Sequence, residues 1–103
     1  KKSFLNAVKK KEKLFLELLK EINNDLNIFS EVKSMGLWLS VTFAKDSNIK
    51  VDELIIACHK NGLMILKANM DTVRFSPSLI IEDMLIEKSM QVFKKTLTQI
   101  LAL

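Results

Sequence analysis

Arg74 is the residue of this sequence whose type and position most clearly suggest binding chemistry. It is the one arginine of the chain, beside fifteen lysines, and it lies in a run where Val73 and Phe75 alternate with polar residues. A strand with this alternation buries Val73 and Phe75 and turns Arg74 to the opposite face. A guanidinium can hold a carboxylate through two parallel hydrogen bonds, which a lysine ammonium cannot do. Two interpretations stay open: an anion-binding arginine, or an ordinary strand arginine that is paired with Asp or Glu or lies on the surface.

Other residues of reactive type form no recognisable catalytic or metal-binding arrangement. Cys58 and His59 are neighbours in a predicted helix, where adjacent positions point in different directions, so neither a metal pair nor a nucleophile dyad follows. We expect Cys58 to be a small buried hydrophobe and His59 to lie on the surface. Glu82 and Asp83 suit the N-terminus of the last helix better than an acid/base pair.

The sequence also lacks the features of a phosphate loop or an activated nucleophile. Its only glycines are Gly36 and Gly62, so no glycine-rich loop is present. The methionines at 64, 84 and 90 fit the filling of a core. We therefore do not expect this chain to be an enzyme by itself.

Composition predicts one folded domain over residues 1–103, because 49% of the residues are hydrophobic and 27% are charged. No apolar run reaches the roughly 20 residues that span a bilayer. The single cysteine suits a reducing, cytoplasmic location. The lysines near the N-terminus, which dominate the net charge of +4, indicate a solvated helix face and no nucleic-acid partner. The chain begins inside a helical pattern without Met, as a fragment of a longer protein would.

Hydrophobic periodicity predicts six regular elements that would position Arg74. The first half of the chain is predicted as a helix over 4–23 ended by 23–25, an extended entry at 28–32, a turn at 33–36, a strand over 37–43 and a polar loop at 44–48. A short helix follows, with Val51, Leu54, Ile55 and Cys58 on one side and a left-handed stop at Asn61-Gly62, and then a strand over 63–66 and a short connection at 68–71. The chain ends with the Arg74 strand, which Pro77 closes, and a final helix with a stripe of Ile86, Met90, Phe93, Leu97 and Ile100. The 63–66 strand is apolar on both faces and is therefore expected in the interior of a sheet.

This order predicts an α+β fold: a small, mostly antiparallel sheet of three to four strands with helices packed on one face. The other face would then carry Ser40, Thr42, Thr72 and Arg74, together with Trp38. Such a half-polar face would meet a partner, which could be another domain.

Three spaced motifs resemble one protein family. They are residues 36–43 (GLWLSVTF), residues 61–66 (NGLMIL) and residues 73–83 (VRFSPSLIIED). Their order and spacing resemble the C-terminal small domain of class III aminotransferases, which are pyridoxal-phosphate enzymes of fold type I. The acetylornithine, succinylornithine and ornithine aminotransferases are the most similar in appearance. The sequence departs from the family pattern at Lys33-Ser34, at Ser40 and at Asn69.

The resemblance implies a function for the parent enzyme. It implies transfer of an amino group from an amino donor such as N-acetylornithine to 2-oxoglutarate, in arginine biosynthesis, by a cytoplasmic homodimer. Pyridoxal 5'-phosphate and its lysine would belong to the large domain, which would be the partner of this domain. Arg74 matches the family's arginine that binds the substrate carboxylate.

Two other classes of function are weighed against this one. The chain could be a stand-alone protein-interaction or dimerisation module without catalysis, whose half-apolar sheet face meets a protein. A basic nucleic-acid binder would show strongly salt-dependent affinity, and we rank it last.

Overall fold

The computed structural model describes residues 2–35, 38–75 and 83–102, with the side chains of 2–8, 35, 38 and 83–85 left undescribed. The elements of this part of the chain are α1 (Lys2–Leu26), β1 (Phe29–Met35), β2 (Trp38–Phe43), the short 3₁₀ turn η1 (Lys45–Ser47), α2 (Val51–Lys60), β3 (Ile65–Asn69), β4 (Thr72–Phe75) and α3 (Asp83–Leu101). The predicted closing role of Pro77 and the position of Glu82 lie outside the described residues.

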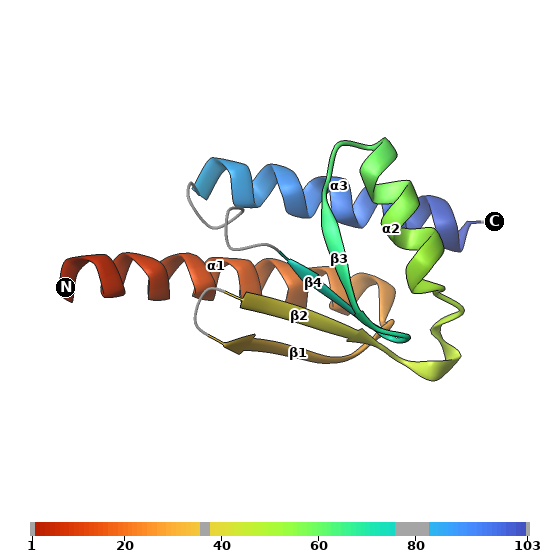
Figure 1. The fold of residues 1–103 in the computed structure, drawn as a ribbon, viewed down its shortest axis with the longest axis horizontal. Helices are drawn as coiled ribbons and strands as arrows, with labels where there is room; N and C mark the ends of the chain where they lie inside the picture. Colours follow the sequence, from red (N-terminus) through yellow and green to blue (C-terminus); the bar gives the residue numbers. More distant parts are fainter. Residues whose placement is uncertain (1, 36–37, 76–82, 103) are drawn as a thin grey trace.

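The four strands form one sheet in the order β1-β2-β4-β3, and each neighbouring pair is antiparallel (Figure 1). Because β2 and β3 are both antiparallel to β4, they run parallel to each other, and α2 connects them across the gap that β4 fills. The predicted α+β class is confirmed. Residues 33–35 are not the predicted turn: Lys33 pairs with Ser40 and Ser34 with Leu39, so this segment completes β1.

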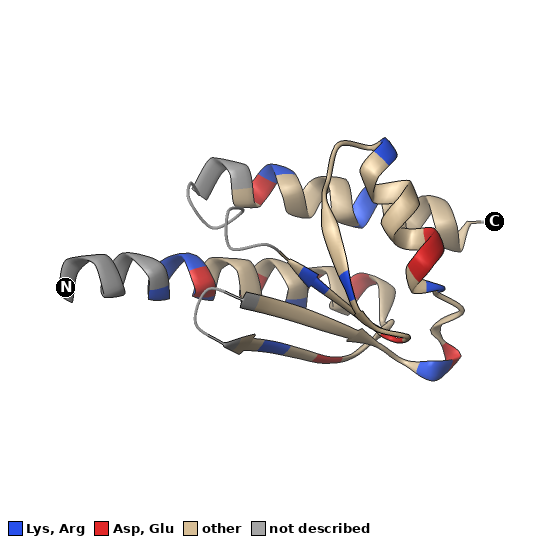
Figure 2. Cartoon of the chain, viewed as in Figure 1, with Lys and Arg blue, Asp and Glu red and all other residues tan. Residues whose placement is uncertain are grey.

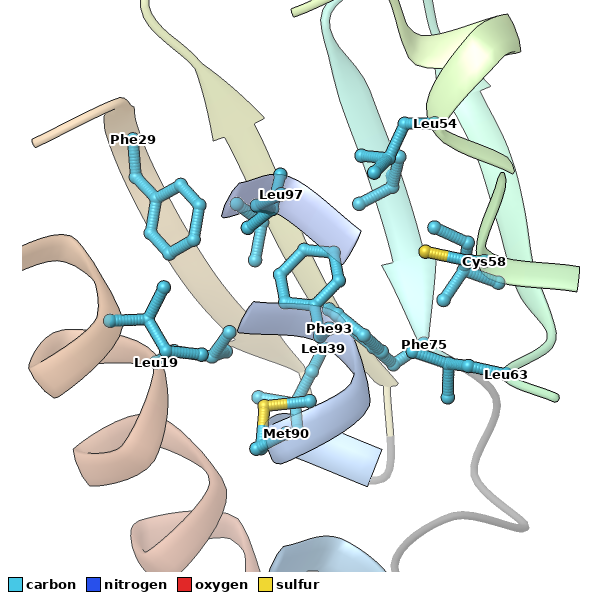
Figure 3. Close-up of a cluster of buried hydrophobic side chains, with 14 of the residues drawn as sticks. Leu19, Phe29, Leu39, Leu54, Cys58, Leu63, Phe75, Met90, Phe93 and Leu97 are labelled. Atoms are coloured by element: carbon cyan, nitrogen blue, oxygen red, sulfur yellow. The ribbon is translucent and has the colours of Figure 1, made fainter. Parts of the chain in front are cut away.

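All three helices pack on one face of the sheet and share one hydrophobic core (Figures 1 and 3). α1 and α3 lie side by side, and both bury an apolar stripe at helical spacing. The predicted stripe of α3 is confirmed, with Ile86, Phe93 and Leu97 fully buried. At the centre, the ring of Phe75 lies 5.2 Å from that of Phe15 and 5.1 Å from that of Phe93, centroid to centroid. Aromatic pairs at this separation add to the stabilisation from burial alone.

The corner between α1 and β1 is held by one side chain. Asn23 Oδ1 accepts hydrogen bonds from the backbone N–H of Ile28 at 2.9 Å and of Phe29 at 2.8 Å. Asn27 then adopts a left-handed conformation with φ 52° and donates its N–H to the Asn23 carbonyl. The helix was predicted to end at residues 23–25, but it continues to Leu26, because Asn23 remains helical while its side chain orders the residues beyond the helix.

α2 ends as its sequence predicts. Gly62 has φ 89°, and the N–H of Leu63 donates to the Cys58 carbonyl at 2.8 Å, which is the hydrogen bond of a Schellman motif. The chain then enters β3, which turns at Met70 and Asp71 into β4.

The expectation that residues 63–66 form an interior strand is wrong. β3 is an edge strand, and the side chains of Met64 and Leu66 are 64% and 46% exposed. Leu63 and Ile65 face the core, so the run is apolar on both faces although the helices cover only one of them. The prediction that Met64 fills the core is therefore wrong, whereas the same prediction for Met90 is confirmed because Met90 is buried. The side chain of Met84 lies outside the described part.

Candidate functional site

The direction of Arg74 is fixed by the two residues that flank it in β4. Val73 and Phe75 are fully buried against the helices, and Arg74 is exposed. Because successive side chains of a strand point to opposite faces, Arg74 projects from the face that the helices leave uncovered. We call this the open face; the sequence predicted this orientation of Arg74.

The neighbours of Arg74 on the open face come from the two adjacent strands. Ser40 of β2 and Leu66 of β3 lie directly opposite Arg74 in the sheet register. Two residues further along, Thr42 and Thr72 are paired, with their hydroxyl oxygens 2.9 Å apart. Ser40, Thr42, Thr72 and Arg74 thus share a face as predicted, and the side chain of Trp38 lies outside the described part. The site therefore presents one guanidinium bordered by hydroxyls and by one apolar side chain.

Lys33 is a further member of this face that sequence reasoning missed. It pairs with Ser40 in the register of β1 and β2, and its Nζ lies 3.7 Å from a carboxylate oxygen of Glu31. Sequence reasoning placed Lys33 in a turn. The alternation of Glu31 and Lys33 with Val32 is the signal that could have identified a strand with one face in solvent.

Cys58 and His59 have the environments that the sequence predicts. Cys58 is fully buried in the core and His59 is exposed. Burial raises the pKa of the Cys58 thiol to about 11, and a hydrogen bond with Thr96 opposes this shift. A thiol that stays protonated at neutral pH is a poor nucleophile. Cys58 therefore acts as a packing residue.

One cleft of the described part is formed by α1 and α3, away from Arg74. A groove of about 240 Å³ lies between α1 and α3, with Glu21, Glu87 and Lys94 among its lining residues. Lys94 forms an ion pair with Asp25 across the two helices. We find no arrangement of nucleophile and base in this groove.

Figure 2 shows acidic and basic residues spread over several elements of the ribbon, including basic positions on β1, β3 and β4. Within the described residues there is no group of three or more His, Cys, Asp or Glu side chains suited to a metal ion. Among the same residues no helix has the length and apolar character required to cross a membrane.

The sequence and the fold of this chain match one enzyme family. The profile described as "Aminotransferase class-III" matches residues 1–97, and the chain belongs to the class-III aminotransferases. The succinylornithine transaminase/acetylornithine aminotransferase of Pseudomonas aeruginosa is 31% identical over 96 residues, which are 93% of this chain and 24% of that protein. The acetylornithine aminotransferase of Pseudomonas putida is 34% identical over 91 residues, 88% of this chain and 22% of that protein.

Solved structures agree with the sequence relatives. The crystal structure of N-acetylornithine aminotransferase from Stenotrophomonas maltophilia superposes with a TM-score of 0.86 at 27% identity, over 94% of this chain and 27% of that one. The ornithine delta-aminotransferase of Plasmodium falciparum gives a TM-score of 0.77 at 29% identity, over 91% of this chain and 24% of that one. The chain thus spans about a quarter of the length of the curated relatives that it matches.

Proposed function

We propose that this chain is the C-terminal small domain of a pyridoxal-phosphate-dependent aminotransferase of the acetylornithine/ornithine type, and that Arg74 binds the carboxylate of its substrate. One observation carries the proposal: Arg74 is exposed on the open face between Ser40 and Leu66, while both of its neighbours in β4 are fully buried. The strand backbone fixes the position and direction of the Cα–Cβ bond of Arg74, so a carboxylate bound by its guanidinium would be held in a reproducible position.

The role of Arg74 would be orientation. A planar fork with two parallel N–H groups fixes both the position and the plane of a carboxylate. Fixing one end of a substrate lowers the entropy lost when its reacting atom approaches the cofactor. The substrates would be an amino donor such as N-acetylornithine and the acceptor 2-oxoglutarate.

The described residues do not fit a complete pyridoxal-phosphate site. A lysine that forms a Schiff base with the cofactor has to lie inside a pocket, and in the described part every lysine is exposed or only half-buried. The whole sequence has two glycines and no glycine-rich loop. The cofactor, which supplies the electron sink for amino transfer, would be bound by a large domain of the same protein, with this domain as its partner. The parent enzyme would be a cytoplasmic homodimer.

The test is substitution of Arg74 by lysine in the full-length enzyme. We expect kcat/KM for 2-oxoglutarate to fall about 10²-fold, or about 2.7 kcal/mol, because the charge remains but the two-point grip is lost. Cofactor absorbance should not change. Lys67→Arg is the matched control, since Lys67 lies on the neighbouring strand and pairs with Asp52 of α2. Unchanged kinetics with both glutamate and 2-oxoglutarate would remove Arg74 from the site.

A second function is favoured by the exposed apolar side chains of Met64, Leu66 and Met70, the last of which is 82% exposed. They would suit a stand-alone interaction or dimerisation module. Sedimentation of the 103-residue chain separates the two. The module is supported if the chain forms a saturable dimer that Leu66→Lys abolishes, and if the natural protein is no longer than these 103 residues. A monomer at high concentration argues against the module.

A further inference from the structure

Asn61 and Gly62 lie in the segment that joins the end of α2 to β3 (Figure 1). The chain has seven asparagines, and only Asn61 precedes a glycine. Asparagine before glycine is especially open to deamidation, because glycine has no Cβ to obstruct its backbone nitrogen as that nitrogen approaches the Asn side-chain carbonyl. Both residues are exposed, so water reaches them. The pair therefore has the chemistry of a modification site.

Deamidation at this pair would need only water as a reactant. The Gly62 backbone nitrogen loses its proton and attacks Cγ of Asn61. A C–N bond forms, the bond from Cγ to Nδ2 breaks, and ammonia leaves, so that a succinimide ring remains. Water then adds to one of the two ring carbonyls. Opening of the ring at Cγ gives aspartate, and opening at the former main-chain carbonyl gives isoaspartate, whose backbone runs through the side chain. No oxidant or reductant takes part.

The folded chain holds the reacting groups of Asn61 and Gly62 apart. Ring closure needs the Gly62 nitrogen and the Asn61 Cβ to be eclipsed about the Asn61 Cα–C bond. The ψ angle of Asn61 is 6°, which eclipses the Gly62 nitrogen with the Asn61 nitrogen and leaves Cβ about 120° away around that bond. The Gly62 N–H also donates to the His59 carbonyl at 3.1 Å, so its proton is harder to remove. The end of α2 therefore has to open before the nitrogen can attack.

The side chain of Asn61 is held against α3. Its Nδ2 donates hydrogen bonds to Thr96 Oγ1 at 2.8 Å and to Gln99 Oε1 at 3.3 Å. Thr96 is fully buried, and its hydroxyl donates to the Val92 carbonyl at 2.8 Å, so its oxygen is an acceptor toward Asn61. This contact ties the end of α2 to α3 and keeps the amide from turning toward the backbone nitrogen.

The deamidated product could not keep this contact. A carboxylate at position 61 has no N–H to donate, so it would place its oxygens against those of Thr96 and Gln99. It would also add negative charge at the C-terminus of α2, which the helix dipole disfavours. Isoaspartate would in addition lengthen the backbone between Cys58 and Leu63, whose hydrogen bond at 2.8 Å ends the helix. Either product therefore weakens the helix end that had protected the asparagine.

We propose that Asn61 is a deamidation site that the folded chain protects through the end of α2 and its contact with Thr96, and that the modification then leaves this end of the helix open. Deamidation proceeds from the fraction of molecules in which the helix end is open. Opening breaks hydrogen bonds donated by Asn61, Gly62 and Leu63, so this fraction is about one in 10². Protection of Asn61 does not depend on the function proposed for Arg74.

The test follows deamidation of the full-length protein in mildly alkaline buffer by peptide mapping with mass spectrometry. The peptide that contains Asn61 gains the small mass that replacement of NH₂ by OH brings, and chromatography separates its aspartate and isoaspartate forms. The rate in urea that unfolds the protein should be about 10²-fold higher than in native buffer. A synthetic peptide of residues 57–66 gives the intrinsic rate in each solvent.

Thr96→Val tests the contact with α3, because valine keeps the branched shape of threonine and lacks the hydroxyl. In native buffer it should raise the rate of deamidation at Asn61 about fivefold, as expected for the loss of one hydrogen bond. Thr98→Val is the matched control, since Thr98 lies on the same helix and donates to the Lys94 carbonyl at 2.8 Å in an exposed position. It should leave the rate unchanged.

Asn61→Asp reproduces the aspartate product and tests its consequence. Hydrogen exchange at the Leu63 amide should be about fivefold faster than in the unsubstituted protein, because the contact with Thr96 is lost. Asn24→Asp adds the same charge near the exposed end of α1 and should leave this exchange rate unchanged.

The remaining outcomes each overturn a part of the proposal. If the unfolded protein shows no deamidation at Asn61, the site is refuted. Equal rates in native buffer and in urea, after correction by the peptide, would show that the fold gives no protection. If Thr96→Val and Thr98→Val have the same effect, the contact with α3 is not what protects the asparagine. Unchanged exchange at Leu63 in Asn61→Asp would refute the opening of the helix end.

Discussion

Replacing Asn23 by alanine tests whether one side chain holds the corner between α1 and β1. The substitution removes the acceptor of two hydrogen bonds, from the N–H groups of Ile28 and Phe29 at 2.9 and 2.8 Å, in a half-buried position. A net contribution of about 1.3 kcal/mol for each bond gives a loss of about 2.6 kcal/mol. Alanine is the better helix former by about 0.6 kcal/mol, so the free energy of unfolding should fall by about 2 kcal/mol.

The neighbouring residue provides a matched control. Asn24 is exposed in the same turn of α1, so Asn24→Ala makes the same gain in helix propensity without losing the corner. Asn23→Asp keeps the acceptor oxygen of both bonds and should cost only about 1 kcal/mol, through the unfavourable charge near a helix C-terminus and the loss of the long hydrogen bond that Asn23 Nδ2 donates to the Phe29 carbonyl at 3.4 Å.

The assay is urea unfolding of the 103-residue chain, followed by circular dichroism at constant m-value. The two alanine variants should differ by about 2.6 kcal/mol, because helix propensity cancels between them. If Asn23→Ala lies within 0.5 kcal/mol of Asn24→Ala, a margin typical of surface substitutions, the corner is held by packing and the hydrogen-bond argument is wrong.

Two further substitutions test the backbone and the buried thiol. Gly62→Ala should lower the free energy of unfolding by about 1 kcal/mol, because φ is 89° and a Cβ there would meet no neighbouring atom, so the cost is backbone strain alone; a thermal melt with Gly62→Asn as the milder variant checks this. For Cys58, the pKa in the folded chain is raised from 9.0 to about 11, so the folded state holds the thiol proton more tightly than the unfolded state. Stability from this group is complete below pH 9 and is lost as pH rises toward 11. The difference in stability between the chain and Cys58→Ala should shrink over this interval, and a constant difference would contradict it.

The sequence predicted the parts of the fold that local patterns determine. Alternation around Arg74 was enough to orient its side chain, because Val73 and Phe75 have to be buried and a strand has only two faces. The left-handed stop at Gly62 was equally local, since few other residues tolerate its φ. The stripe of α3 from Ile86 to Leu97 followed from the helical period.

The errors arose where pairing between distant segments decided the outcome. Lys33 and Ser34 have no strong strand preference, and they are extended because β2 offers a complete ladder. Met64 and Leu66 suggested an interior strand because a run that is apolar on both faces is typical of burial on both sides. The helices of the described part cover only one of those faces. The alignment of Lys33, Ser40 and Arg74 across the open face could not be predicted, because it depends on the strand order β1-β2-β4 as well as on the register.

The position of β4 between β2 and β3 has a consequence for the nascent chain. β4 follows both of its neighbours in sequence, and Thr72 pairs with a residue 30 positions earlier. During synthesis, β2 and β3 therefore leave the ribosome before β4, the strand that pairs with both of them. Until then each bordering strand offers unpaired backbone groups to other chains. Arg74 belongs to the strand that fills this gap, so a chain that ends before β4 lacks Arg74 and leaves both bordering strands open to aggregation.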